Sequence, residues 1–174
     1  MEKLERWHDF FVLVGTAGAT LLALLFVAVS LGAGVLTDKK AAATRAFFSP
    51  VVVHLTAVFF ISAVALFPAH KAATFAAMVG GCAAIGGGIA LFTTIELLRH
   101  SWTSYVQDHL AYGLLPATAY FALLVAAAMV FNEHDYAMIV LACSLLLLLI
   151  VNIRNAWDLT LSMVYRHAGE KKKR

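Results

Sequence analysis

The residues of this chain that could carry chemistry lie where its long apolar runs end. His54 lies inside one run, Glu96 and Arg99 close another, and the segment NIRNAWDL at 152–159 closes the last. On helices, residues three or four positions apart share a face. If these helices face one another, their polar side chains would form one cluster, a candidate vestibule or proton-responsive site. That cluster comprises His54, Glu96, Arg99, Asn152, Arg154, Asn155 and Asp158.

A structural alternative explains the same residues without a site. Arg99 and Arg154 would extend their charged heads to lipid headgroups, and the acidic side chains would pair with them locally. Arg99 would pair with Glu96, at i,i+3, and Arg154 would pair with Asp158, at i,i+4. Sequence spacing is compatible with both interpretations.

Other familiar chemistries lack the residues they need. Cys82 and Cys143 lie in apolar runs without a CxxC partner, so we expect small buried hydrophobic residues. The serines of the apolar runs have no nearby base. A haem in a helix bundle generally takes two axial ligands, and no second histidine is expected at the depth of His54, except from a homodimer. We therefore expect no catalytic residue, no metal and no cofactor.

Glycine is concentrated in one stretch, where five of the nine residues from 80 to 88 are glycine. Spacing by four places Gly80, Ala84 and Gly88 along one helical face and Ala77 and Gly81 along the next. Such small-residue faces allow membrane helices to approach closely, so we expect Gly80, Gly81, Ala84 and Gly88 to serve helix packing. Packing within the chain and a self-association seam are both compatible with the pattern.

The composition indicates that lipid surrounds the elements that carry these residues. Hydrophobic residues make up 62% of the 174, charged residues 13%, and the mean hydropathy is +0.85. Soluble domains average roughly 45–50% apolar and about 25% charged residues. A bilayer lets apolar side chains face outward, which this chain requires.

Five apolar runs are long enough to cross a bilayer as helices, which takes about 20 residues. The sequence therefore predicts an all-α, polytopic transmembrane helix bundle forming a single domain over residues 1–166. The predicted spans are 10–36, 47–67, 73–98, 111–131 and 136–153, followed by a helical extension and a basic tail at 167–174.

The distribution of lysine and arginine predicts the orientation. Five spans place the termini on opposite sides, and cytoplasmic loops of membrane proteins are enriched in basic residues. With the C-terminus inside, ten of the thirteen basic residues are cytoplasmic, and only Lys3, Arg6 and Lys71 lie outside. We therefore predict an N-out, C-in topology. The basic tail would contact anionic lipid rather than nucleic acid, because no basic, aromatic-bearing domain accompanies it.

The start of the first span carries a second polar group, in the sequence RWHDFF. Trp7 is expected to anchor the helix at the outer membrane interface. Asp9 is expected to cap the helix N-terminus, where its carboxylate interacts favourably with the positive end of the helix dipole. In an oligomer, the same residues would instead form an acidic ring at a channel mouth.

Two segments resemble a known family. WHDFFVLVGTAGATLLALLFVAVSL near the N-terminus and NIRNAWDL near the C-terminus, together about a third of the chain, resemble a family of small bacterial multi-span membrane proteins. Some members of that family are labelled modulators of a membrane-bound protease. The resemblance implies a bacterial inner-membrane location and supplies no catalytic residues.

Three functions follow as expectations, in order. The first is a non-enzymatic inner-membrane protein acting through helix–helix association, either with itself or with a membrane partner that it regulates. The second is a homo-oligomeric ion channel or small-solute transporter, with the region of His54, Glu96 and Arg154 lining a pathway. Because one copy has only five spans and no inverted repeat, transport would require an oligomer. The third is a membrane haem or redox protein.

Overall fold

Helices account for nearly all of the residues that the computed structural model describes, which are 6–32, 38–68, 71–100 and 110–171. No strand occurs in those ranges. The helices are α2 (His8–Gly32), α3 (Asp38–Leu66), α4 (Ala72–His100), α6 (Leu115–Phe131) and α7 (Ala137–Lys171). A π-helical turn, η2 (Leu110–Leu114), leads directly into α6. The predicted all-α bundle is confirmed.

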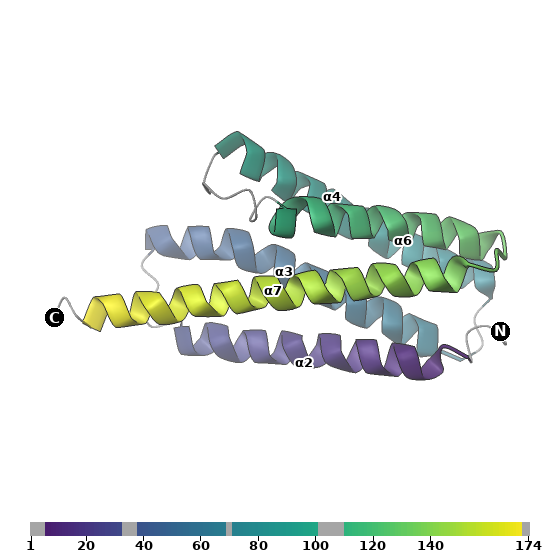
Figure 1. The fold of residues 1–174 in the computed structure, drawn as a ribbon, viewed down its shortest axis with the longest axis horizontal. Helices are drawn as coiled ribbons and strands as arrows, with labels where there is room; N and C mark the ends of the chain where they lie inside the picture. The colour runs from purple at the N-terminus through teal and green to yellow at the C-terminus, as the bar shows by residue number, and fades with distance from the viewer. Residues whose placement is uncertain (1–5, 33–37, 69–70, 101–109, 172–174) are drawn as a thin grey trace.

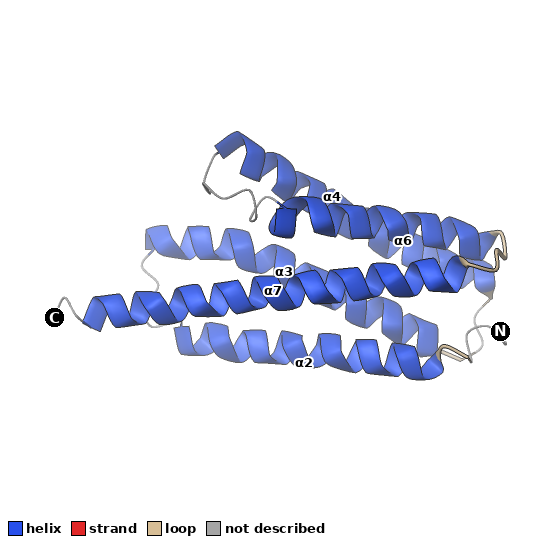
Figure 2. Ribbon diagram, in the orientation of Figure 1, coloured by secondary structure: helices blue, strands red, loops and turns tan. Residues whose placement is uncertain are grey.

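Successive helices run in opposite directions, and the N- and C-termini lie at opposite ends of the bundle (Figures 1 and 2). The most extensive contacts join α2 to α3, α4 to α6 and α6 to α7. Because α7 also contacts both α2 and α3, it connects the two halves of the bundle. We call the end where α7 finishes the C-terminal end of the bundle.

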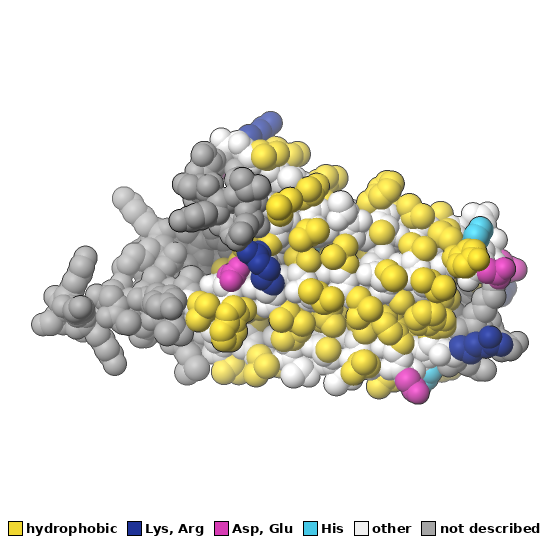
Figure 3. Space-filling model, in the orientation of Figure 1, with side chains coloured by type: hydrophobic (Ala, Val, Ile, Leu, Met, Phe, Trp, Pro, Cys, Tyr) yellow, Lys and Arg dark blue, Asp and Glu magenta, His cyan; other side chains and the backbone are white. Residues whose placement is uncertain are grey.

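The surface is that of a membrane-embedded, multi-pass protein. Among the described residues, four segments are long and apolar enough to cross a membrane: His8–Ala28, Ala72–Glu96, Leu110–Phe131 and Ala137–Leu161. Hydrophobic side chains cover the middle of the visible face, and the charged side chains drawn lie toward its two ends (Figure 3). Large apolar residues such as Leu13, Ile85 and Phe121 are about 70% exposed, which favours lipid rather than water around them.

The second predicted span, 47–67, lies within α3 but for its last residue. Pro50–Leu66, the helical part of that span whose side chains the structure describes, is apolar. It lies antiparallel to α2 and packs along it. Five crossings, with the N-terminus outside, remain a prediction.

Two helices are longer than the spans predicted from hydropathy. α3 begins at Asp38, inside the segment TDKKAAATRA that we expected to be a connection. The alanines of that segment have the highest helix propensity of any residue, so the helix continues beyond its apolar part. The fifth span and its predicted extension form one helix that continues to Lys171, inside the segment assigned to the tail. Residues 172–174 lie outside the described part of the chain.

Glycines allow α2 and α3 to approach closely. A Cβ atom added at Gly15 would lie 2.9 Å from the Cβ atom of Ser62, and one added at Gly18 would lie 3.3 Å from Cγ1 of Val58. A larger residue at Gly15 would therefore push the helices apart. This contact is the small-residue packing expected of helices in lipid.

Candidate functional site

A buried histidine–tyrosine pair joins α3 to α6. His54 is 1% exposed and Tyr120 is completely buried. Nδ1 of His54 lies 2.9 Å from the hydroxyl oxygen of Tyr120, and the two ring centroids are 5.3 Å apart. His54 is therefore buried, as its place inside an apolar run predicts. Its hydrogen-bond partner, Tyr120, is not evident from the sequence. Nothing in the local pattern around residue 120 reveals a partner 66 positions away.

The glycines of α4 create the space that Tyr120 occupies. A Cβ atom at Gly86 would overlap the tyrosine ring and lie 2.6 Å from its hydroxyl oxygen. A Cβ atom at Gly87 would lie 3.3 Å from Cβ of Tyr120. α4 therefore directs the ring of Tyr120 toward His54, and the two glycines that make room for it are not among the four residues that we singled out.

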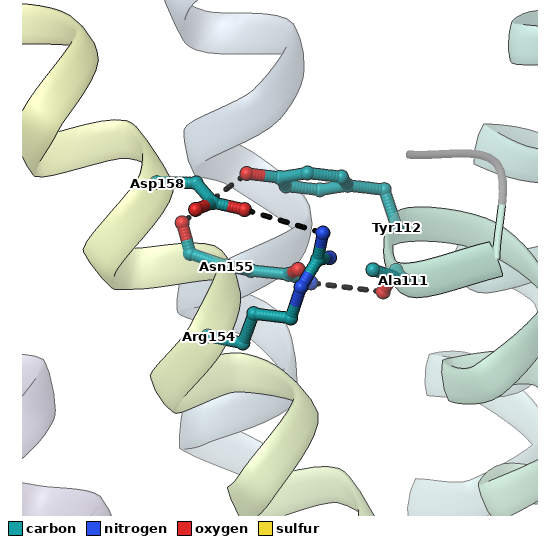
Figure 4. Close-up of polar contacts among 5 residues, drawn as sticks. All are labelled: Ala111, Tyr112, Arg154, Asn155 and Asp158. Atoms are coloured by element: carbon teal, nitrogen blue, oxygen red, sulfur yellow. Dashed lines mark hydrogen bonds and ion pairs between the residues drawn. The ribbon is translucent and has the colours of Figure 1, made fainter. Parts of the chain in front are cut away.

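A second polar junction connects α7 to the π turn (Figure 4). The side-chain nitrogen of Asn155 donates a hydrogen bond to the carbonyl oxygen of Ala111 at 2.9 Å. The hydroxyl of Tyr112 donates to the backbone carbonyl of Asn155 at 3.2 Å. Asn155, Ala111 and Tyr112 are all buried. The two bonds fix the start of the α6 segment against α7.

Proline explains why this junction needs a side-chain donor. In a π-helical turn the carbonyl of residue i accepts from the N–H of residue i+5. For Ala111 that residue is Pro116, which has no N–H. An unpaired carbonyl in the hydrocarbon region costs several kcal/mol, so the amide of Asn155 replaces the missing donor.

Arg154 and Asp158 form the ion pair expected from their i,i+4 spacing, at 3.6 Å (Figure 4). Their side chains are 42% and 40% exposed. An exposed helical pair of this kind contributes about 0.3–0.5 kcal/mol. The local pairing of the structural alternative is therefore present on α7, whatever else these residues do.

Asn152 is completely buried on the inward face of α7. Its side-chain nitrogen donates to the carbonyl of Leu148 at 2.7 Å, one turn earlier in the same helix. Both asparagine amides therefore point their nitrogens at carbonyls. Their oxygens, Oδ1 of Asn152 and Oδ1 of Asn155, have no hydrogen-bond partner in the described part of the chain.

The remaining members of the predicted cluster lie apart from this core. Glu96 and Arg99 are exposed in the last turns of α4. Figure 1 shows α4 diverging from α3 and α7 at that end. The seven predicted residues therefore form three groups: His54 with Tyr120, the α7 residues beside η2, and the end of α4. A single vestibule that contains all seven residues stays a prediction.

The predicted packing residues divide between two sides of α4. Gly80 faces α6, where an added Cβ atom would lie 3.6 Å from Cβ of Ala127. Gly81, Ala84 and Gly88 are exposed. An added Cβ atom at Gly81 or Gly88 would meet nothing within 4 Å. We call Gly81, Ala84 and Gly88 the outer face of α4.

An apolar groove of about 420 Å³ runs between α3 and α4 beside this outer face. Almost none of its surface is polar. Its walls include Val52, Thr56 and Phe60 of α3 and Met78, Gly81 and Ile85 of α4. A groove with this lining suits apolar chains or another helix rather than a charged solute.

The N-terminal group is structural. Trp7 is half-buried and packs edge-on against Phe10, with ring centroids 5.5 Å apart. α2 begins at His8, so Asp9 lies in the first turn instead of at the cap position. Its carboxylate is 3.2 Å from Nδ1 of His8. The carboxylate still lies at the favourable end of the helix dipole.

Neither metal nor thiol chemistry is indicated. No group of three or more His, Cys, Asp or Glu residues within the described ranges is placed to hold a metal ion. Cys82 and Cys143 are both free. The expectation of burial is wrong for Cys143, which is exposed on the apolar surface of α7, where lipid rather than protein would surround it.

Comparisons of the chain with protein-family models, with curated proteins and with solved structures found no match. The resemblance of its two terminal segments therefore remains an expectation.

Proposed function

We propose that this chain is a non-enzymatic, multi-pass protein of the bacterial inner membrane that acts through helix–helix association at the outer face of α4. One observation carries the proposal. α4 packs Gly86 and Gly87 against Tyr120, but a Cβ atom added at Gly81 or Gly88 would meet no atom of the described residues within 4 Å.

Glycines without a packing role are costly in a helix. Each lowers helix stability by about 1 kcal/mol relative to alanine in water, with a smaller penalty expected in lipid. In membrane proteins such glycines allow close helix–helix contact, which here would be with a helix outside the chain. The groove beside Gly81 adds a concave apolar surface on which a second helix would rest.

The occupant proposed for this face is a second copy of the chain. The outer face consists of small, uncharged residues, so association would depend on van der Waals packing between backbones. A different membrane protein, regulated by the contact, would use the same chemistry and is an alternative outcome of the test.

Leucine substitutions at the outer face test the proposal. Gly88→Leu and Gly81→Leu add side chains into open space, so the bundle should fold normally while close approach is blocked. Ala128→Leu is the matched control, because Ala128 is exposed on α6, away from this face. Subunit number is measured by single-molecule photobleaching in liposomes.

The proposal predicts oligomers for the unmodified chain and for Ala128→Leu, and monomers for the two glycine variants. Oligomers that persist in Gly88→Leu would exclude this face as a self-association seam. A monomeric unmodified chain would favour a different membrane partner, to be sought by pull-down in mild detergent.

A further inference from the structure

Three buried polar atoms at the centre of the bundle lack hydrogen-bond partners in the described ranges. They are Nε2 of His54, Oδ1 of Asn152 and Oδ1 of Asn155. Each belongs to a side chain that is at most 1% exposed. A buried polar atom without a partner costs about 1–3 kcal/mol, and more in hydrocarbon, so three together require an explanation.

Helix geometry places the three atoms at neighbouring levels. Asn155 lies level with Ala111 and Tyr112, to which it is hydrogen-bonded. Asn152 lies one turn further into the bundle, about 4.5 Å along α7. Tyr120 lies about 12 Å beyond Tyr112 on α6. Its side chain should lean back toward the start of that helix. The backbones of Tyr120 and Asn152 are thus about 7.5 Å apart along the bundle, and the lean of the tyrosine side chain shortens this separation.

The packing brings the same groups toward one axis. α7 contacts both α3, which carries His54, and α6, which carries Tyr112 and Tyr120. Tyr120 crosses to His54 over Gly86 of α4. The remaining buried atom without a partner, Oγ of Ser62, lies elsewhere, beside Gly15 of α2.

The chemistry of these atoms matches water. Two amide oxygens accept hydrogen bonds, and the free imidazole nitrogen accepts or donates according to its tautomer. A buried water typically makes about three hydrogen bonds to otherwise unsatisfied polar groups. A hard divalent cation prefers at least six oxygen ligands, usually including carboxylates. This group offers two amide oxygens and no carboxylate.

We propose that His54, Asn152 and Asn155 form an internal water-binding site in the half of the bundle nearest its C-terminal end. Ordered water would connect the Tyr120–His54 pair to the Asn155–Tyr112 junction. Beyond that junction lies the partly exposed Arg154–Asp158 pair. The site is separate from the outer face of α4, so the result of the self-association test does not bear on it.

Hydroxyl-radical footprinting with X-ray pulses tests this site on the unmodified chain in lipid nanodiscs. Radicals formed from bound water modify adjacent side chains even when bulk water cannot reach them. Tyr120 and Tyr112 should therefore be modified several-fold more than Phe11 and Phe75, which are equally buried but remote from the three polar atoms. Exposed Tyr136 serves as the positive control.

Asn152→Leu supplies the second arm of the experiment. Replacing the amide with an apolar group should reduce modification of Tyr120 several-fold and leave Tyr136 unchanged. Modification of Tyr120 no greater than that of Phe75 in the unmodified chain would overturn the proposal, whether or not the variant folds. Undiminished modification of Tyr120 in a folded Asn152→Leu variant would overturn the assignment of Asn152.

Discussion

At Gly86 the lack of a side chain determines where Tyr120 lies, and through Tyr120 it determines the partner of His54. The ring occupies the volume that a Cβ atom would need. Two positions later, on the other side of the helix, a Cβ atom added at Gly88 would meet nothing within 4 Å. Gly86 and Gly88 therefore have different roles in the same helix, and alanine substitutions at the two positions distinguish these roles.

Gly86→Ala should destabilise the bundle, because the added methyl overlaps Tyr120 and either moves the ring or separates α4 from α6. Overpacking of this kind costs about 1–3 kcal/mol. Gly88→Ala should be neutral or stabilising by up to about 1 kcal/mol, because alanine is the better helix former. Unfolding free energies in micelles, measured by SDS titration, make the comparison. Equal stabilities of the two variants would show that Gly86 has no special packing role.

The sequence identifies some of these residues and not others. The position of His54 inside an apolar run predicts its burial, because polar residues in membrane helices usually face the bundle interior. The spacing of Arg154 and Asp158 predicts their pair. Tyr120 is not predictable in the same way, since its role depends on the approach of three helices. The division of the glycines also depends on how α4 is rotated, which the four-residue repeat leaves open.

At the scale of elements, the π turn before α6 and the amide of Asn155 form one unit. Hydropathy predicts the apolar run at 111–131 but says nothing about its backbone. Pro116 is the local signal of irregularity, because it removes a donor from the first turn of α6. The partner that compensates for it lies 44 residues later, on α7.

A double-mutant cycle tests this unit. Asn155→Ala should cost about 1–3 kcal/mol, because it leaves the carbonyl of Ala111 unpaired. Pro116→Ala restores a backbone N–H, so the cost of Asn155→Ala should fall in that background. Unfolding free energies of the four chains give the coupling. The same cost in both backgrounds would show that Asn155 does not compensate for the proline.

Helix lengths illustrate a second limit at this scale. Hydropathy locates the apolar part of each helix but not its continuation into polar sequence. α3 starts at Asp38 and α7 continues to Lys171 because alanine-rich and mixed polar segments continue a helix once it has nucleated. The predicted boundaries therefore mark where the apolar sequence ends rather than where the helix ends.

At the scale of the whole molecule, lipid is the solvent that explains the fold. Apolar runs long enough for helical crossings predict an all-α bundle, because helices satisfy their own backbone hydrogen bonds within a bilayer. The structure adds the arrangement, with α7 connecting two halves and the termini at opposite ends. Both proposals depend on this arrangement. The outer face of α4 must lie in hydrocarbon, and the three buried polar atoms must lie away from bulk water.

Cysteine labelling of the two ends of the bundle tests this account most directly. In a chain carrying Cys82→Ala and Cys143→Ala, single cysteines are introduced by His8→Cys, Glu133→Cys and Gly169→Cys. A membrane-impermeant maleimide is then applied to sealed spheroplasts of a bacterial host. Five crossings with the N-terminus outside predict labelling of the first two chains at once and of the third only after permeabilisation. Labelling of His8→Cys and Gly169→Cys from the same side would contradict the account.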